Sequence, residues 1–137
     1  MPAAARRHNP DQQPQPIYRY TRAQAIDDGM LVDLTEWASA TTGFHGGFRV
    51  PVAVTTGVWA DLNAIPASKQ SSQDVRGRAH DLLWMASLAA RRAGETSTVH
   101  FQVIMHLGRT SRQTYKLMIH PGDRGEPVVT ILRPNES

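Results

Sequence analysis

Residues 99–132, VHFQVIMHLGRTSRQTYKLMIHPGDRGEPVVTIL, carry the clearest structural pattern in the chain. Apolar residues occupy alternate positions over 99–107 and over 115–119. This two-residue period is typical of a strand with one buried face. The glycine- and proline-containing segment 121–127 predicts a tight connection to a third strand over 128–132. Three consecutive strands joined by short loops favour an antiparallel meander.

A long helix is predicted directly before the meander, from about Asp74 to Ala93. Its apolar residues recur at spacings of three and four, and several are alanines, which favour close packing against a sheet. Gly94 ends the helix, and Arg91 and Arg92 in its last turn complement the helix dipole. We therefore expect an α+β fold with an antiparallel sheet of three to four strands, packed by this helix and several short N-terminal helices.

The segment IYRYTRAQAIDDGMLVDLTE, residues 17–36, predicts how the chain enters this fold. Thr21 and Gln24 have the spacing of a capping box, in which each side chain bonds the backbone amide of the other residue. Gly29 has the conformational freedom that ends a short helix. A second helix is expected over about 33–40, with its cap at the first of these residues.

The region between these helices and the long one has weaker patterns. Residues 30–32 are expected to cross the core, and residues 48–54 are predicted to form a strand. Pro51 has no N–H to donate to a ladder, so we expect this strand at a sheet edge or a bulge. A further helix is expected to begin at Thr55 or Thr56.

Length and composition predict one domain. The chain has 137 residues, of which 40% are apolar and 20% charged, and it contains no cysteine. Residues 1–16 are rich in proline and glutamine and are expected to be a disordered tail, before a domain over 17–133 and a loose C-terminus over 134–137. No apolar run has the length of a membrane span, and no apolar segment follows Arg6 and Arg7, so we expect a cytoplasmic protein without membrane contact.

Charge differs between the two halves. Residues 76–133 contain nine basic and four acidic residues, a net charge of +5, whereas residues 17–75 have a net charge of −2. The sequence pI of about 9.8 argues against mimicry of DNA, which requires an acidic surface. A weak, sequence-independent nucleic-acid binder is one alternative function. Its candidate contacts are Arg76, Arg78, Arg109, Arg112 and Lys116.

The sequence offers little catalytic chemistry. His100, His106 and His120 share the polar positions of the predicted strands, but six residues of strand separate the first two by roughly 20 Å, too far to share one ion. Signatures for phosphate loops, dinucleotides and nucleophile elbows are absent. We expect no metal, no cofactor and no enzymatic activity. The remaining enzyme alternative is the acidic cluster Asp27, Asp28, Asp33 and Glu36.

Other residues are better suited to binding a partner. Asp27 and Asp28 lie in the last turn of a predicted helix, where acidic residues are disfavoured, and Trp84 lies outside the alanine stripe of the long helix. A glycine-rich segment around His45 has the composition of a binding loop. The partner-binding candidates are Asp27, Asp28, Phe44, His45, Trp84, Arg109, Arg112 and Lys116.

Four blocks together resemble a family of small bacterial proteins of unknown function, often encoded on plasmids, integrative elements and phages. They are IYRYTRAQAIDDGMLVDLTE, PVAVTTGVWADL, RGRAHDLLWMASLAARR and GDRGEPVVTIL, and the resemblance covers residues 17–133. It implies a mobile-element origin and carries over no catalytic residue. We therefore expect a non-enzymatic module that binds a host protein or ribonucleoprotein, as counter-defence inhibitors of the anti-CRISPR or anti-restriction type do. The oligomeric state stays open.

Overall fold

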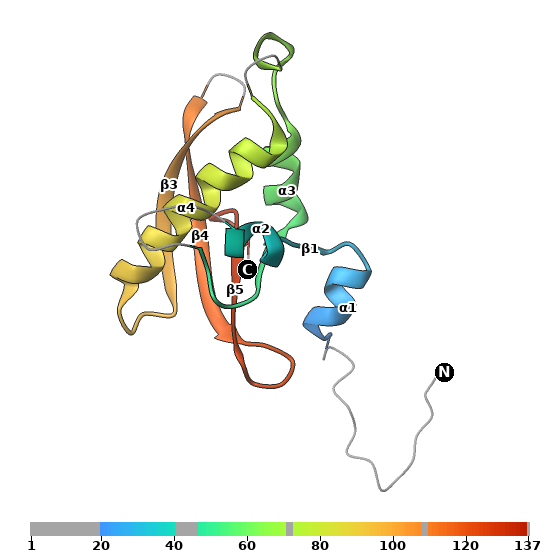
Figure 1. Ribbon diagram of the computed structural model, residues 1–137, viewed down its shortest axis with the longest axis vertical. Coiled ribbons are helices and arrows are strands. Elements are labelled where there is room, and N and C mark those ends of the chain that lie inside the picture. Colours follow the sequence, from blue (N-terminus) through green and yellow to red (C-terminus); the bar gives the residue numbers. More distant parts are fainter. Residues whose placement is uncertain (1–19, 41–46, 71–72, 108–109, 137) are drawn as a thin grey trace, which may run out of the picture.

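The computed structural model describes residues 20–40, 47–70, 73–107 and 110–136 (Figure 1). Within these ranges, five strands form one sheet in the order β1-β2-β5-β4-β3, which confirms the predicted α+β class. The elements in chain order are α1 (Arg22–Asp27), β1 (Leu31–Asp33), α2 (Thr35–Ala40), β2 (Val52–Thr55), α3 (Thr56–Asn63), the 3₁₀ turn η1 (Ala67–Lys69), α4 (Val75–Ala93), β3 (Thr98–Leu107), β4 (Thr110–Pro121) and β5 (Pro127–Leu132).

The last three strands form the predicted antiparallel meander. Phe101 of β3 lies opposite Tyr115 of β4, and Leu117 of β4 lies opposite Ile131 of β5. All four side chains are buried in the main core, which they share with α4. Figure 1 shows α4 crossing the sheet over β3 and β4. The alternation of apolar residues in the sequence therefore marks the face of the sheet that the long helix covers.

The long helix begins and ends as predicted. The Asp74 carboxylate caps α4 by accepting a hydrogen bond of 2.6 Å from the Gly77 amide, and Gly94 at the other end has a φ of +60°. The helix buries a stripe of small and aliphatic side chains, which lets its backbone approach the sheet closely. This stripe consists of Ala79, Leu82, Leu83, Ala86 and Ala89.

The prediction for the strand around Pro51 is wrong in its position. The strand is β2, and it lies inside the sheet, antiparallel to β1 and parallel to β5. Pro51 immediately precedes the strand and contributes only its carbonyl, which accepts a hydrogen bond of 2.9 Å from the Val129 amide. The missing N–H of proline therefore removes no ladder bond, and an inner position is allowed.

The sheet is also larger than predicted. Residues 30–32 were expected only to cross the core, but Leu31–Asp33 form the short edge strand β1, so the sheet has five strands instead of three to four. The parallel pair of β2 and β5 joins residues more than seventy positions apart, such as Val52 and Val129. Parallel pairing needs a long crossover and leaves no short-range signal in the sequence.

The expected N-terminal caps are present with one change. Thr21 and Gln24 form the capping box of α1, and Gly29 after it has a φ of +78°. The Thr55 hydroxyl accepts the Val58 amide and caps α3. Helix α2 begins two residues later than expected, because the Asp33 carboxylate accepts the amide of Thr35 in a local turn instead of starting the helix.

The predicted tail over 1–16 lies outside the described residues. The C-terminus over 134–137 was expected to be loose, but Glu136 contacts the body of the protein. Its carboxylate accepts hydrogen bonds of 2.8 Å from the Thr55 hydroxyl and 2.7 Å from the Arg133 amide, and its carbonyl accepts Lys116 Nζ. Of the helices in the described ranges, none is long and apolar enough to cross a membrane.

Candidate functional site

A groove runs along the outer edge of β3, beside α4. A cavity of about 520 Å³ there is lined by Trp84 and Met85 of α4 and by Ile104 of β3. The Trp84 side chain is 39% exposed and that of Ile104 is 65% exposed. Two large exposed apolar side chains therefore border one cavity at the edge of the sheet, Trp84 from the α4 side and Ile104 from the opposite face, which marks a surface suited to binding.

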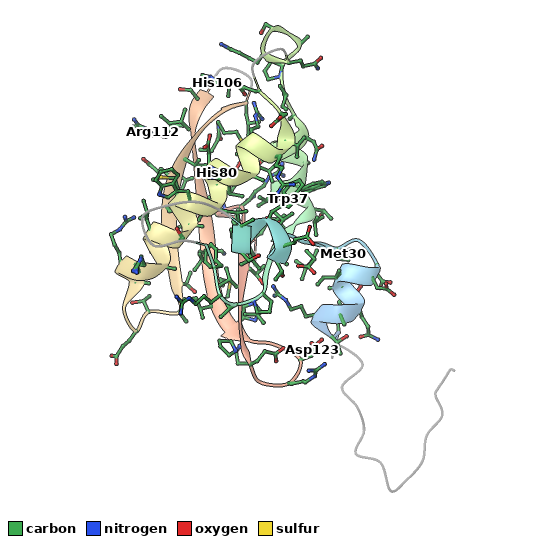
Figure 2. All side chains as sticks on the ribbon, viewed as in Figure 1. Met30, Trp37, His80, His106, Arg112 and Asp123 are labelled. Carbon is green, nitrogen blue, oxygen red and sulfur yellow. The ribbon has the colours of Figure 1, made fainter. Side chains whose placement is uncertain are left out.

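A second cavity extends this groove along the strand. It has a volume of about 470 Å³, shares Asp81 and Ile104 with the first cavity, and reaches His106. Figure 2 shows His106 and Arg112 in the upper left part of the molecule, away from Met30 and Asp123 at the lower right. We call this continuous surface the β3 groove. Its members are Asp81, Trp84, Met85, Gln102, Ile104, His106 and Arg112.

The position of Trp84 follows from the helical period. Leu83 before it is fully buried and Met85 after it is partly buried, so Trp84 lies at the border of the buried stripe, beside the outer edge of β3. The His80 ring contacts the indole edge-on, with 5.7 Å between the ring centroids. This contact holds the exposed indole in place without covering it, which reduces the entropy that a binding partner must remove.

Ile104 is exposed because of the strand alternation. Phe101, Val103 and Met105 of β3 are buried, so Ile104 lies on the opposite face of the sheet, where it pairs with Arg112 of β4. Sequence reasoning placed it among the polar positions of the strand without assigning it a role. The available signal was that the residues two positions away on the same face, Gln102 and His106, are polar. A β-branched apolar residue at such a solvent-facing position is unusual.

Among the described strands, none pairs with the outer side of β3, so its backbone has polar groups without a strand partner along the groove. The Ser97 carbonyl accepts a hydrogen bond of 2.8 Å from the Ile119 amide of β4. In an antiparallel pair, residues that bond the neighbouring strand alternate with residues that do not. Because Ser97 bonds β4, the even-numbered residues of β3 direct their N–H and C=O groups away from β4. His100, Gln102 and Ile104 therefore present backbone donors and acceptors at the outer edge, because β3 is the last strand of the sheet.

Of the predicted partner-binding residues, the structure brings Trp84 and Arg112 together. Both line the same cavity. Among the residues that the structure describes, the exposed Arg112 side chain has no hydrogen-bond or ion-pair partner, so its guanidinium is free to bind an anion. Phe44, His45 and Arg109 lie outside the described residues.

Other candidates lie elsewhere. Asp27 is the last residue of α1 and Asp28 follows it, and both side chains are exposed. They are close in sequence to Met30, which Figure 2 shows on the opposite side of the molecule from Arg112. The Tyr20 hydroxyl donates a hydrogen bond to Asp28, and this bond raises the pKa of Tyr20 to about 12. This contact gives Asp28 a structural partner that the sequence did not predict.

The basic residues of the nucleic-acid alternative do not form one surface. Arg78 is only 5% exposed and donates to three backbone carbonyls, including that of His106 at 2.7 Å, so its guanidinium is not available to a phosphate. Arg76 stacks over the Trp37 ring at 5.1 Å, and Lys116 donates to the C-terminal segment. These side chains contact three different parts of the protein, unlike the continuous basic stripe that nucleic acid requires.

The histidines and carboxylates show no metal-binding arrangement in the described part of the chain, where no group of three such side chains is placed to hold an ion. His100 and His106 lie on β3, and His120 lies on β4 with its Nε2 atom 2.8 Å from the Thr130 hydroxyl. The Asp33 carboxylate is used by the backbone of Thr35. This local bond gives Asp33, one of the four residues of the acidic cluster, a structural role.

A partly buried polar network was not predicted from the sequence. Arg133 donates to the Asp61 carboxylate at 2.6 Å, and the Tyr115 hydroxyl donates to the same carboxylate at 2.9 Å. Burial raises the pKa of Tyr115 above its usual value. The three side chains border a cavity of about 260 Å³, but they satisfy one another, as the members of a structural network do. No local pattern predicts this network, because 54 and 72 positions separate the partners.

Comparison with known proteins places the chain in one family. A family model described as a family of unknown function, DUF6573, matches residues 12–137. Neither the curated proteins nor the solved structures contain a match to the chain.

Proposed function

The chain belongs to the DUF6573 family of unknown function, and from that premise we propose that it is a non-enzymatic module that binds a protein of its host through the β3 groove. The supporting observation is the group of Trp84, Ile104 and Arg112 in one groove. Tryptophan and arginine are enriched among the residues that dominate binding energy at interfaces. Solvent-exposed side chains of this type at one place favour recognition of a macromolecule over chemistry on a small molecule.

The host context of the proposal comes from the sequence. The four sequence blocks resemble proteins carried on plasmids, integrative elements and phages, and small proteins of such elements act mainly on host machinery. We propose a cytoplasmic protein of a bacterial host that inhibits a defence system of the anti-CRISPR or anti-restriction type. Because the pI is about 9.8, the inhibitor acts by covering a protein or ribonucleoprotein surface and not by imitating DNA.

Affinity capture with matched variants tests this function. The tagged protein is incubated with extract of a bacterial host, and the bound proteins are identified by mass spectrometry. We expect Trp84→Ser to lose the specific partner, because it removes the central aromatic side chain of the groove. Met30→Ser is the control, since Met30 is 59% exposed but lies away from the groove.

Two results would reject the proposal. Equal loss of the partner in both variants would show general adhesion to exposed apolar side chains and no role for the groove. Recovery of nucleic acid alone, with a yield that falls steeply as salt rises, would favour the nucleic-acid alternative. In that case Arg112→Gln and Lys116→Gln are expected to reduce recovery, while Trp84→Ser is not.

A further inference from the structure

We propose that β3 binds an extended segment of the partner by strand addition, and that this segment alternates apolar with acidic side chains. The inference rests on the proposed function, and it specifies the mode of recognition and the chemistry of the partner segment. It has three sources: the outer backbone of β3, the different character of the two sides of that strand, and the charge around it.

The first source is the composition of the edge. Residues 98–107, TVHFQVIMHL, form a ten-residue outer strand with no lysine, arginine, aspartate, glutamate or proline. Soluble proteins usually protect long edge strands with such residues, because the unpaired backbone groups pair with other chains. The opposite edge of the sheet needs less protection, since β1 has only three residues. The ladder to β4 is irregular between Ile104 and Leu107, and the His106 carbonyl accepts Arg78, so the open stretch of this edge is residues 98–104. Strand addition requires an open stretch of this kind.

The second source is the difference between the two sides of the edge. Side chains of an added strand alternate between the α4 side and the opposite side of the sheet. The α4 side offers Trp84 and Met85, which are apolar. The opposite side offers His100, Gln102 and Arg112, which are polar or basic, together with the exposed Ile104 beside Arg112. A segment with apolar side chains toward α4 and acidic side chains toward Arg112 matches both sides with a period of two.

The third source is charge, which selects between an acidic segment and a second copy of the chain. Among the groove members, Arg112 is exposed on the face of the sheet opposite α4, whereas the carboxylate of the groove, Asp81, belongs to α4. A second copy would bring its own Arg112 toward this face, whereas an acidic side chain there is electrostatically complementary. Arg112 has no partner in the described part of the chain and lies beside Ile104 at the edge. Its guanidinium can bind one carboxylate through two hydrogen bonds.

A defined peptide tests the proposal on the intact protein. The probe is a capped peptide of about eight residues, the length of a typical strand, that alternates valine with aspartate. We expect slower hydrogen exchange at the outward amides of His100, Gln102 and Ile104 when it binds, and smaller changes at residues between them. The control peptide has lysine in place of aspartate, and it is expected to bind at least about tenfold more weakly, which corresponds to about 1.4 kcal/mol.

Two changes separate strand addition from side-chain contact alone. N-methylation of alternate peptide amides removes the backbone donors and is expected to weaken binding about tenfold. Gln102→Pro removes an outward N–H of β3 while leaving the bonds to β4 in place, and Gln102→Thr is its matched control. We expect the proline variant to lose the peptide and the threonine variant to keep it.

The outcomes distinguish this inference from the proposed function. If Trp84→Ser loses the captured host partner while Gln102→Pro keeps it, the groove binds a partner but strand addition is wrong. No change at the β3 amides, or equal binding of the acidic and the basic peptide, also overturns the inference. Concentration-dependent self-association that protects the same amides without peptide would assign the edge to a second copy of this chain.

Discussion

The two faces of the sheet are held to their helices by different interactions. On one face, α4 packs against side chains such as Val103 and Leu117, and the contact is apolar. On the other side, Arg22 of α1 donates to the Thr130 hydroxyl at 2.8 Å and the Val129 carbonyl at 2.7 Å. Apolar packing is strong and non-directional, whereas these bonds each depend on one geometry. The α4 face therefore sets the stability of the whole sheet, and the second contact sets the stability of α1 alone.

The loop between β4 and β5 completes the α1 contact. Its Asp123 carboxylate accepts the amides of Arg22 and Ala23 at 2.7 and 3.0 Å, so a negative charge lies at the start of α1 (Figure 2). We call Arg22, Asp123 and Thr130 the α1 anchor. Because it joins parts of the chain about a hundred residues apart, loss of the anchor releases α1 without opening the core.

The largest effect is expected from a cavity under α4. Leu117 is fully buried between the sheet and the helix. Leu117→Ala should reduce the free energy of unfolding by about 2 to 5 kcal/mol, as buried leucine truncations do. Denaturant unfolding of the wild type and the variant measures the difference. Leu117→Met is the control and should lose less than about 1.5 kcal/mol, because it nearly conserves the volume. A loss below this limit in Leu117→Ala would contradict the assignment of this face as the main core.

The second effect concerns a buried polar group at the border of the same core. The guanidinium of Arg78 donates to the carbonyls of Asp61 and His106 and so connects α3, α4 and β3. Arg78→Met keeps most of the volume but removes the guanidinium from these carbonyls, of which that of Asp61 keeps a hydrogen bond from the Ala64 amide. A buried carbonyl left unpaired should cost about 1 to 3 kcal/mol. Arg78→Lys should recover only part of this, since an ammonium cannot span both acceptors. Denaturant unfolding that shows no loss in Arg78→Met would contradict the structural role.

The contrast between the faces explains what the sequence could predict. The order of the meander strands and the bounds of α4 were predicted, because the period of the apolar residues and the caps at Asp74 and Gly94 are local signals. The middle strand, β4, is longer than the alternation over 115–119 indicated. The caps at Thr21 and Thr55 were predicted for the same reason. Features that depend on contacts between distant segments were missed, including the inner position of β2 and both polar networks.

The candidate site was predicted only in part, also for physical reasons. Trp84 was identified because it departs from the helical stripe, and Arg112 was selected by charge. Ile104 was not selected, because only the sheet order makes β3 an edge and gives its exposed side chain a meaning. Arg78 was assigned to a basic surface, but three carbonyls from two other segments, the end of α3 and β3, hold it inside the protein. Burial of a charged side chain by such acceptors has no sequence pattern.

A smaller and local effect is expected at the α1 anchor. Arg22→Met removes two hydrogen bonds from a charged donor and should destabilise α1 by about 1 to 2 kcal/mol. Hydrogen exchange of the Ala25 amide, which bonds Thr21 within α1, should become faster, while amides of β4 and β5 remain protected. Arg124→Met is the control, since this exposed arginine makes no side-chain bond within the described ranges. Faster exchange throughout the sheet would show that the two faces are not independent.

The smallest effect is expected from acid at the same anchor. Hydrogen bonds from the Arg22 and Ala23 amides hold the pKa of Asp123 below its ordinary value. A carboxylate with a lowered pKa in the folded state stabilises the fold fully above its unfolded pKa of about 3.9, and this contribution is lost as the pH falls through the lowered folded value. The amide chemical shifts of Arg22 and Ala23, measured by NMR, should therefore titrate with a midpoint below about 3.9.

Two variants separate this titration from general acid unfolding. Asp123→Asn should abolish the acid titration of the Arg22 and Ala23 amides, because the amide side chain carries no charge at any of these pH values. Glu126→Gln should leave it unchanged, since the Glu126 carboxylate accepts the Arg124 amide and not α1. A midpoint at or above the ordinary aspartate value would mean that the loop does not hold the start of α1 in solution. The difference between the two faces would then rest on Arg22 and Thr130 alone.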